Sequence, residues 1–351
     1  MEIRIYDSEM NFLGIIENHT SLLWNRKYYE PGNFEMHVPF TDSNYSLIQQ
    51  GNLIWKKGSN EAGVIEYITR EESSKNSQIT VKGRFLSSYM DRRLIKETYT
   101  ANNIKVEIAM REILSRATSI PKVELGQLKN YEDKVTFQAT YKNLLTYETR
   151  LSKASNIAYR FRPDFVNKKI FFETYRGIDR SIKQSDRSRV VFSESYKNIK
   201  NAKYEENSQL YKNVCYVGGQ GEGVNRTIVV TGDDSLTGLD RREVFLNASD
   251  IQTSDLSIDE YKAALSQRGE SGLNEDTIVE SFECTCEASG NFIYKDDYDL
   301  GDVVTVIKES WGLSIDLRIT EVREVYENES AKIELTFGTP LPEVISWSDD
   351  L

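Results

Sequence analysis

Short segments in which apolar and polar side chains alternate recur along most of the chain. Phe34, Met36 and Val38 alternate with polar residues, and residues 157–161 alternate in the same way until Pro163 ends the segment. Further segments of this kind lie at 79–83, 135–139, 169–175, 214–217, 226–231, 303–307 and 332–337. Successive side chains of a strand point to opposite faces, so a period of two predicts strands, and the Gly, Asn and Asp residues between them predict turns. We therefore expect a predominantly β protein built from antiparallel barrels or sandwiches.

Three stretches have the apolar spacing of amphipathic helices instead. Two of them cover residues 106–117 and 144–154, each with its apolar residues on one face. The third begins at Ser257, which forms a capping box with Glu260, and Gly269 is expected to end it. Its predicted apolar face consists of Ile258, Tyr261 and Leu265. We interpret all three helices as structural.

A faint internal repeat links the two ends of the chain. The run Gly51-Asn52-Leu53-Ile54 resembles Gly301-Asp302-Val303-Val304, a glycine and a polar turn residue before a buried strand. A strand with a glutamate follows in each copy, at Glu66 and Glu321, and then an alternating strand that ends in glycine, at Gly83 and Gly338. Chance similarity between β-hairpins is one explanation. The other is that the two ends are versions of one small β-barrel.

The predicted domain division follows from the repeat and the helices. At about 150 residues per domain, a chain of 351 residues corresponds to two or three domains. We expect a first β-barrel at 1–98, an α+β middle domain at 99–200, and a second β-barrel at 201–345 with a helical insertion near 254–276. Residues 346–351 form a short tail. The predicted fold class is thus α+β, predominantly β, with two related small antiparallel β-barrels joined by an α+β domain.

Charge is distributed unevenly along the chain, whose net charge is −11. Residues 1–232 hold 35 basic and 27 acidic side chains, whereas residues 233–351 hold 9 and 28. This split fits either two differently solvated surfaces or complementary docking between copies or with other subunits. Abundant aromatic residues argue against disorder, and no apolar run approaches the roughly 20 residues of a membrane span. The start of the chain lacks the pattern of a secretory signal, so we expect a protein that is made in the cytoplasm and stays there unless a larger particle carries it out.

Residues suited to catalysis or metal binding are scarce. Cys215, Cys284 and Cys286 are an odd number without a CxxC pair, which argues against a disulfide framework or a zinc site and favours buried apolar thiols. His19 and His37 are the only histidines, so the chain has too few of them for most catalytic triads or histidine-ligated metal sites. We therefore predict no catalytic residue, no cofactor and no metal ligand, and hence a protein that is not an enzyme.

A glycine-rich segment at 218–223 is the most conspicuous motif. It follows a predicted strand, as a dinucleotide-binding loop would. The residues after it, from Arg226 to Val230, predict another strand and not a helix, so no helix N-terminus is available for a pyrophosphate. We interpret the segment as a flexible β-turn.

Two charged clusters leave alternative functions open. The carboxylates between Asp296 and Asp302 fit a carbohydrate-binding or glycan-hydrolysing cleft, which needs only two of them, or a charged turn before a strand. Seven basic residues between Lys168 and Arg189 lie among aromatics and fit a nucleic-acid track, although acidic residues intersperse them.

Several motifs in order resemble the tail hub family of bacteriophages and phage-tail-like particles, over about residues 3 to 340. The motifs are residues 29–34 with 38–39, 177–181, 191–193, 213–223 with Arg226, 238–243, and 298–302. The motif residues to which we assign a structural role are Gly32, Phe34, Pro39, Gly177, Asp179, Arg180, Ser181, Gly219, Gly221, Gly223, Arg226, Asp299, Gly301 and Asp302.

The resemblance implies a homotrimeric ring in which each subunit contributes two similar β-barrels to the distal end of a tail tube. Its implied partners are further copies of itself, the tail tube or distal tail protein, and a spike or fibre protein, with transient passage of DNA or a tape-measure protein. Family members often continue into a lytic or receptor-binding region, whereas this sequence ends at Leu351, so we expect a separate spike or fibre polypeptide. The expected location is the virion tail or a phage-tail-like particle, with no membrane span.

Overall fold

The structure is a computed structural model that describes residues 1–72, 77–253, 256–275, 279–286, 291–327 and 330–338. The chain forms two compact units. The first unit comprises Met1–Asn25, Tyr29–Arg176 and Leu210–Thr277, and the second comprises Arg26–Tyr28, Gly177–Gln209 and Ile278–Leu351. Each unit is thus assembled from segments that are far apart in the sequence. The predicted boundaries at 98, 200 and 345 stay a prediction, because compactness alone does not show which segments fold independently.

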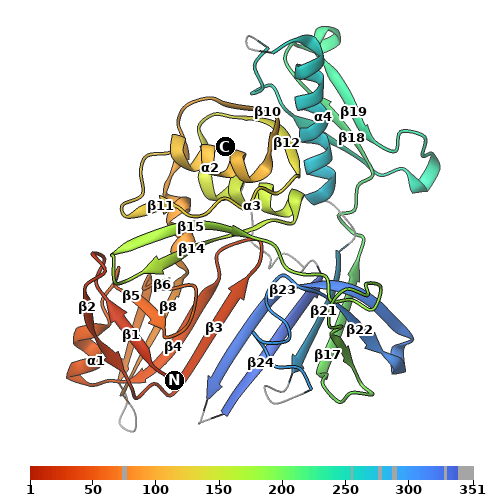
Figure 1. Ribbon diagram of the computed structural model, residues 1–351. Helices are drawn as coiled ribbons and strands as arrows, with labels where there is room; N and C mark the ends of the chain where they lie inside the picture. Colours follow the sequence, from red (N-terminus) through yellow and green to blue (C-terminus); the bar gives the residue numbers. More distant parts are fainter. Residues whose placement is uncertain (73–76, 254–255, 276–278, 287–290, 328–329, 339–351) are drawn as a thin grey trace. The chain divides into compact units, whose positions relative to one another are not determined.

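The N-terminal part of the first unit contains two antiparallel sets of strands (Figure 1). One has the order β2-β1-β5-β6, with β1 (Ile3–Tyr6), β2 (Phe12–Ile16), β5 (Leu53–Lys56) and β6 (Gly63–Val64). The other has the order β3-β4-β8-β7, with β3 (Ser21–Lys27), β4 (Asn33–Pro39), β7 (Tyr67–Glu72) and β8 (Ser77–Arg84). The short helix α1 (Asp42–Leu47) connects β4 to β5, and the 3-10 helix η1 (Leu86–Arg92) follows β8. The sequence pattern did not predict either of them.

The middle part of the first unit places two helices beside short sheets (Figure 1). The helices are α2 (Val106–Arg116) and α3 (Leu144–Ser155), which confirms the two predicted amphipathic segments. The strands are β9 (Leu94–Ile95) with β13 (Lys142–Asn143), β10 (Tyr99–Lys105) with β12 (Lys134–Ala139), and β11 (Val123–Leu125), β15 (Lys169–Tyr175) and β14 (Ala158–Asp164). Pro163 lies within β14 and not after it. Among the described strands β14 pairs with β15 alone, and an edge strand tolerates a residue without an N–H.

The third part of the first unit packs one helix on a three-stranded sheet (Figure 1). The elements are β18 (Val214–Gly218), β19 (Ile228–Gly232), β20 (Glu243–Asn247), α4 (Ile258–Glu275), and the 3-10 helices η2 (Gly223–Asn225) and η3 (Gly238–Asp240). The prediction that Gly269 ends the helix is wrong, because α4 continues past it. A methyl group there would lie 2.3 Å from Thr231 Oγ1, so this glycine permits close packing. Ile258 is exposed, while Tyr261 and Leu265 are buried as predicted.

The second unit is a largely antiparallel sheet with the order β17-β21-β24-β23, extended by β22 and β16. Its elements are β16 (Val191–Ser193), β17 (Lys200–Asn207), β21 (Val279–Cys286), β22 (Val303–Lys308), η4 (Glu309–Trp311), β23 (Leu313–Glu327) and β24 (Ser330–Gly338). Among the described strands of this unit, β16 alone pairs in parallel, with β22. Arg26–Tyr28, the end of β3 and the residue after it, belong to this unit, and the Tyr28 N–H donates to the Thr320 carbonyl at 2.9 Å.

The two units share one sheet pattern. The order β3-β4-β8-β7 corresponds to β17-β21-β24-β23, and every neighbouring pair in both is antiparallel. Phe34 opposes Gly83 as Phe282 opposes Phe337, and Tyr67 opposes Lys82 as Glu321 opposes Thr336. By this register the predicted correspondences of Glu66 with Glu321 and of Gly83 with Gly338 are each displaced by one residue. A displacement by one residue places side chains on opposite faces of a strand, so these matches in the sequence do not mark equivalent positions in the two sheets.

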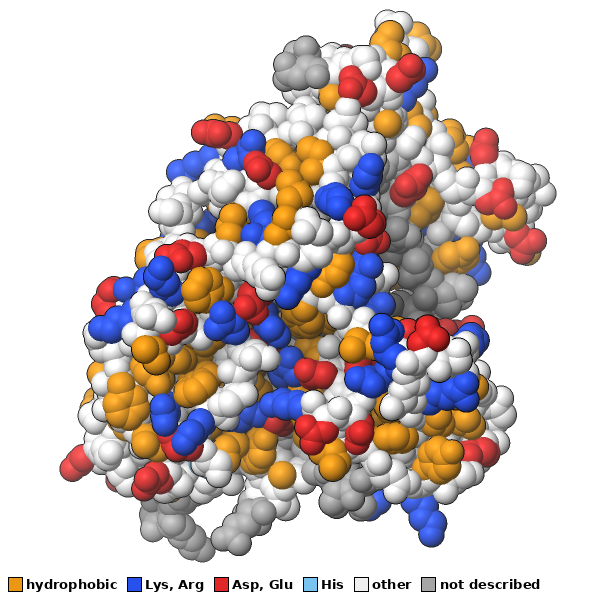
Figure 2. Space-filling view, viewed as in Figure 1, with side chains coloured by type: hydrophobic (Ala, Val, Ile, Leu, Met, Phe, Trp, Pro, Cys, Tyr) orange, Lys and Arg blue, Asp and Glu red, His pale blue; other side chains and the backbone are white. Residues whose placement is uncertain are grey.

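The predominantly β architecture with few helices agrees with the predicted class. Among the described strands, neither unit's pairings close into a complete barrel. The charge halves of the sequence do not coincide with the units, since the first unit's residues carry a net charge of −3 and the second unit's −8. On the face shown in Figure 2, side chains of both signs are interspersed. The split into a basic and an acidic part of the sequence is therefore not a split between the two units.

One buried carboxyl group is anomalous within the core of the first unit. Glu148 on α3 is fully buried, and neither of its oxygens has a hydrogen-bond partner among the described residues. Burial raises the pKa of the Glu148 carboxyl well above its ordinary value. The folded state therefore holds this proton more tightly than the unfolded chain. The resulting stabilisation is complete below the unfolded pKa and is lost as pH rises through the folded pKa.

We accordingly expect Glu148→Met to raise the free energy of unfolding by about 1–3 kcal/mol at neutral pH, because it removes an unsatisfied buried group. The advantage of the variant over the wild type should grow between pH 5 and pH 8. Urea unfolding followed by circular dichroism measures this difference. Glu270→Met, at an exposed position of α4, is the control and should show no such pH trend. An advantage independent of pH would contradict the account.

Candidate functional site

Tyr28 is closely enclosed by residues of the second unit. The residue is fully buried, and a methyl group on Gly301 would lie 2.2 Å from its ring. The Arg318 guanidinium lies over the same ring, 5.1 Å from its centre. The Gly177 N–H donates to the Tyr28 hydroxyl at 3.3 Å. Both motif glycines therefore face this tyrosine, and neither position has room for a side chain.

Asp302 fastens two of the motifs to each other. Its carboxylate accepts the Ile178 N–H at 2.7 Å and the Arg180 Nε–H at 2.9 Å, while the side chain is almost entirely buried. A methyl group on Gly177 would lie 1.9 Å from the Gly301 carbonyl, so the two backbones touch. These contacts hold the segment after Arg176 against the start of β22, and we refer to them as the motif clamp.

The remaining residues of these two motifs complete the same cluster. Asp299 Oδ1 pairs with Arg26 Nη1 at 2.6 Å, and that nitrogen also lies 2.6 Å from the Tyr294 hydroxyl oxygen. Burial raises the pKa of Tyr294, so the phenol stays protonated near neutral pH. Asp179 Oδ1 accepts the N–H of the buried Ser181 at 2.9 Å. The structure thus brings seven of the fourteen predicted residues together: Gly177, Asp179, Arg180, Ser181, Asp299, Gly301 and Asp302.

Three further predicted residues lie in the first unit around β4. Phe34 is buried, and its ring fills the space where side chains on Gly63 or Gly83 would be. A methyl group on Gly32 would lie 2.2 Å from the Asn25 carbonyl oxygen. Pro39 is the last residue of β4. These contacts show packing, and a further role for these residues stays a prediction.

The glycine-rich segment forms the connection between β18 and β19 and is held at both ends. The Gln220 N–H donates to the Tyr261 hydroxyl at 2.6 Å, and a methyl group on Gly219 would lie 2.2 Å from the same oxygen. Arg226 donates to the carbonyls of Gly218 at 2.9 Å and Gly219 at 3.0 Å. Gly221 and Gly223 lie in the turn between these anchors. The segment leads into β19, as the sequence pattern predicted.

Tyr261→Phe should therefore loosen this segment without unfolding the unit. The variant leaves the Gln220 N–H without its partner, which costs about 1 kcal/mol. Hydrogen exchange read by mass spectrometry should become faster in peptides that cover 219–225. Tyr45→Phe removes an exposed hydroxyl from α1 and should leave exchange unchanged. Equal protection of 219–225 in the wild type and Tyr261→Phe would contradict this assignment.

The two charged clusters that suggested other functions are largely engaged in contacts. In the acidic cluster, Asp299 and Asp302 are bound in ion pairs, and Asp297 accepts the Ile293 N–H. In the basic segment the ion pairs join Lys169 to Glu124, Arg176 to Asp133, Arg180 to Asp302, and Lys183 to Asp316. The basic segment is also divided between the two units at Gly177. Neither cluster presents a continuous, unpaired row of charges.

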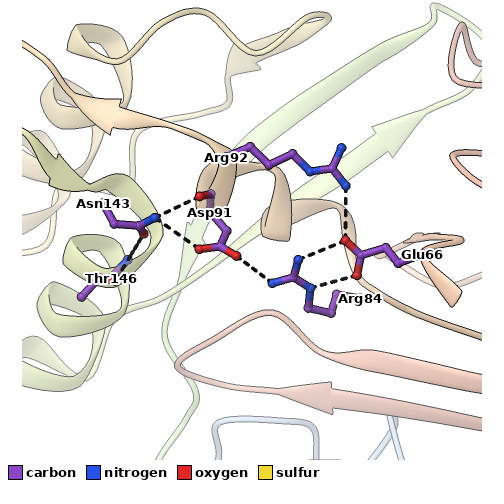
Figure 3. Close-up of polar contacts among 6 residues, drawn as sticks. All are labelled: Glu66, Arg84, Asp91, Arg92, Asn143 and Thr146. Carbon is purple, nitrogen blue, oxygen red and sulfur yellow. Dashed lines mark hydrogen bonds and ion pairs between the residues drawn. The ribbon is translucent and has the colours of Figure 1, made fainter. Parts of the chain in front are cut away.

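A charged network in the first unit joins the sheet to helix α3 (Figure 3). Arg84 binds Glu66 through two hydrogen bonds, at 2.9 and 3.0 Å, and Asp91 through one at 3.0 Å. Arg92 lies 3.2 Å from Glu66. Asn143, whose side chain caps α3 at Thr146, donates to Asp91 at 3.2 Å. Burial alone would raise the pKa of Glu66, but the hydrogen bonds from Arg84 outweigh it and hold the pKa below its ordinary value.

A hollow of about 350 Å³ adjoins this network. Its lining consists of Gln50, Gly51, Val64, Ile65, Glu66 and Arg92. The repeat in the sequence pointed to Gly51 and Glu66. It gave no indication of Arg84, Asp91 or the buried position of Tyr28. No local pattern indicates these residues, because their partners lie in segments distant in the sequence.

Other kinds of site find little support in the described part of the chain. No group of three or more His, Cys, Asp or Glu side chains among those residues is placed to hold a metal ion. Cys215 and Cys284 are buried and not in a disulfide, and the side chain of Cys286 lies outside the described residues. No helix within the described ranges combines the length and apolar character needed to cross a bilayer.

The fold is that of phage tail proteins, as three solved structures show. A tail protein from Neisseria meningitidis MC58 matches with a TM-score of 0.62 and 13% identity, covering 96% of each chain. The 43 kDa tail protein of prophage MuSo2 from Shewanella oneidensis matches with a TM-score of 0.59 and 14% identity, covering 97% of this chain and 99% of that one. Prophage tail protein gp18 from Listeria monocytogenes EGD-e matches with a TM-score of 0.58 and 14% identity, covering 99% and 97%.

The chain belongs to the family described as Siphovirus ReqiPepy6 Gp37-like protein, whose model matches residues 2–339. This confirms the predicted resemblance to phage tail proteins. No curated protein sequence matches the chain.

Proposed function

We propose that this protein is a structural hub of a phage tail or phage-tail-like particle, in which three copies form a ring between the tail tube and a separate spike or fibre protein. The observation that carries the proposal is the repeated sheet, β3-β4-β8-β7 in one unit and β17-β21-β24-β23 in the other. A subunit with two similar modules lets three copies present six modules to a sixfold tube. In this proposal each module is one of the two predicted small β-barrels.

The proposal assigns the clusters of buried charge to stability and not to catalysis. Asp299 is paired with Arg26 and Asp302 with Arg180, so these two acids do not form the unpaired carboxylate pair that a glycosidase would need. His37 is engaged with Glu35, and its other ring nitrogen contacts Gln78 and Thr80. We accordingly propose a protein that is not an enzyme and that lines a channel for DNA or a tape-measure protein.

Deleting the gene in the cell that produces the particle tests this function. We expect particles without a complete distal end, and restoration by the wild-type gene supplied in trans. Electron microscopy of purified particles gives the readout. Complete tails with normal distal ends in the deletion strain would contradict the proposed function.

A further inference from the structure

The two halves of the repeat carry the same turn, held by the same pair of hydrogen bonds. In the first unit the Gly51 N–H donates to the Ile65 carbonyl and the Ile65 N–H to the Asn52 carbonyl, both at 2.8 Å. In the second unit the Gly301 N–H donates to the Ile319 carbonyl and the Ile319 N–H to the Asp302 carbonyl, also at 2.8 Å. Gly51 and Gly301 both adopt positive φ, +86° and +96°, as this turn requires. The two sites are therefore equivalent residue by residue.

One of these equivalent sites is filled and the other is open. A methyl group on Gly301 would collide with the Tyr28 ring, whereas a methyl group on Gly51 would meet nothing within 4 Å. The open space at Gly51 is the hollow of about 350 Å³. The Tyr28 ring fills the site at Gly301 in the second unit, and no described residue fills the equivalent site at Gly51.

The walls of the hollow correspond to the residues that hold Tyr28. Leu53 and Val303 each lie two residues after the equivalent glycine. Leu53 pairs with Val64 and Val303 pairs with Arg318, so Val64 is the counterpart of Arg318. By the same register Glu66 holds the place of Thr320. The Thr320 carbonyl accepts the Tyr28 N–H, whereas the Glu66 carbonyl accepts the exposed Gln50 side-chain amide, at 3.0 Å. An incoming backbone N–H can displace this amide at little cost, since water then hydrates the glutamine.

The repeat also indicates which segment would enter the hollow. Tyr28 is the first residue after β3, and β17 holds the place of β3 in the second unit. By this register the counterpart of Tyr28 is Ser208, the first residue of the segment 208–211 that directly follows β17. This segment contains Leu210, 63% exposed, and Tyr211. Among the described residues, nothing lies within 4 Å of a methyl group built on Gly51.

We propose that residues 208–211 of a second copy of this chain insert into the hollow at Gly51, as Tyr28 covers Gly301. This inference rests on the proposed ring and names the contact that closes it. Each copy carries one donor segment and one acceptor hollow, so the interface is heterologous and generates a ring when the rotation closes. Arg92, half-exposed at the rim, lies over the Tyr89 ring and pairs with Glu66, so it forms one edge of the acceptor hollow.

Cross-linking between separately made variants tests the contact. Full-length protein with Gln50→Cys is mixed with full-length protein with Leu210→Cys, at a concentration where native mass spectrometry shows assembly, and a short bismaleimide is added. Both positions are exposed in the single chain. We expect a covalent dimer on a denaturing gel from the mixture and a covalent trimer, without larger species, from the double variant. Val166→Cys, 91% exposed, replaces Leu210→Cys in the matched control and should give neither.

The outcomes separate this inference from the proposed function. Trimers by native mass spectrometry without cross-linking through Gln50→Cys and Leu210→Cys overturn the contact but leave the hub intact. Covalent species larger than a trimer on the gel of the double variant would overturn the proposal of a closed ring. A protein that stays monomeric at millimolar concentration overturns the self-contact, and the gene deletion then decides the hub function on its own.

Discussion

Asp302→Ala should lower the free energy of unfolding by about 3–5 kcal/mol, the cost of removing one partner of a buried ion pair. The variant leaves the Arg180 guanidinium and the Ile178 N–H without their acceptor in a place where water has little access. The loss should concentrate in the second unit, since both partners lie there. Hydrogen exchange should accelerate in peptides covering 177–193 and 303–308, while peptides covering 3–16 in the first unit keep their protection.

Asp296→Asn provides the control within the same acidic cluster. Its side chain is exposed and makes no ion pair among the described residues, so we expect a change within about 0.5 kcal/mol. If Asp302→Ala and Asp296→Asn cost the same, the motif clamp does not stabilise the unit.

Gly301→Ala should be markedly more destabilising than Gly51→Ala, although the two glycines occupy equivalent turns. Both substitutions place an alanine at positive φ, which costs about 1–2 kcal/mol. Only Gly301→Ala also drives a methyl group into the Tyr28 ring, and overpacking of this kind adds about 1–3 kcal/mol. Urea unfolding with exchange readouts for each unit measures the two costs separately.

A double-mutant cycle isolates the contact with the ring. Tyr28→Ala alone should destabilise the second unit, and adding Gly301→Ala to it should cost only the backbone strain seen for Gly51→Ala. A coupling of about 1–3 kcal/mol between Tyr28 and Gly301 is expected. Strict additivity would show that the tyrosine does not determine the requirement for glycine.

The sequence predicted the elements better than their connections. Alternation located β15 to the residue and most of the other strands that it predicted to within two residues at each end, because each short strand carries its own face pattern. It failed where packing overrode the local rule. Gly269 lies inside α4 because the helix approaches the β18–β19 sheet closely, and Pro163 lies inside β14 because that strand is an edge. Neither neighbour is visible from the local sequence.

The candidate site was predicted in part for the same reason. The motifs at 177–181 and 298–302 were recognised separately, and their resemblance to a family gave no indication that Asp302 binds Arg180. Tyr28 was missed because it packs against residues of the second unit, whose other segments begin about 150 residues later in the sequence. Contacts between distant segments depend on topology, which a single sequence without an alignment does not reveal.

The number of copies in each particle tests the central claim most directly. Quantitative mass spectrometry of purified particles, with labelled peptides of this chain and of the tail tube protein as standards, gives the ratio of the two. A ring of three subunits below a sixfold tube predicts three copies per particle, or one for every two subunits of a single tube ring. Absence from the particles, or a copy number that follows tail length, would contradict the account.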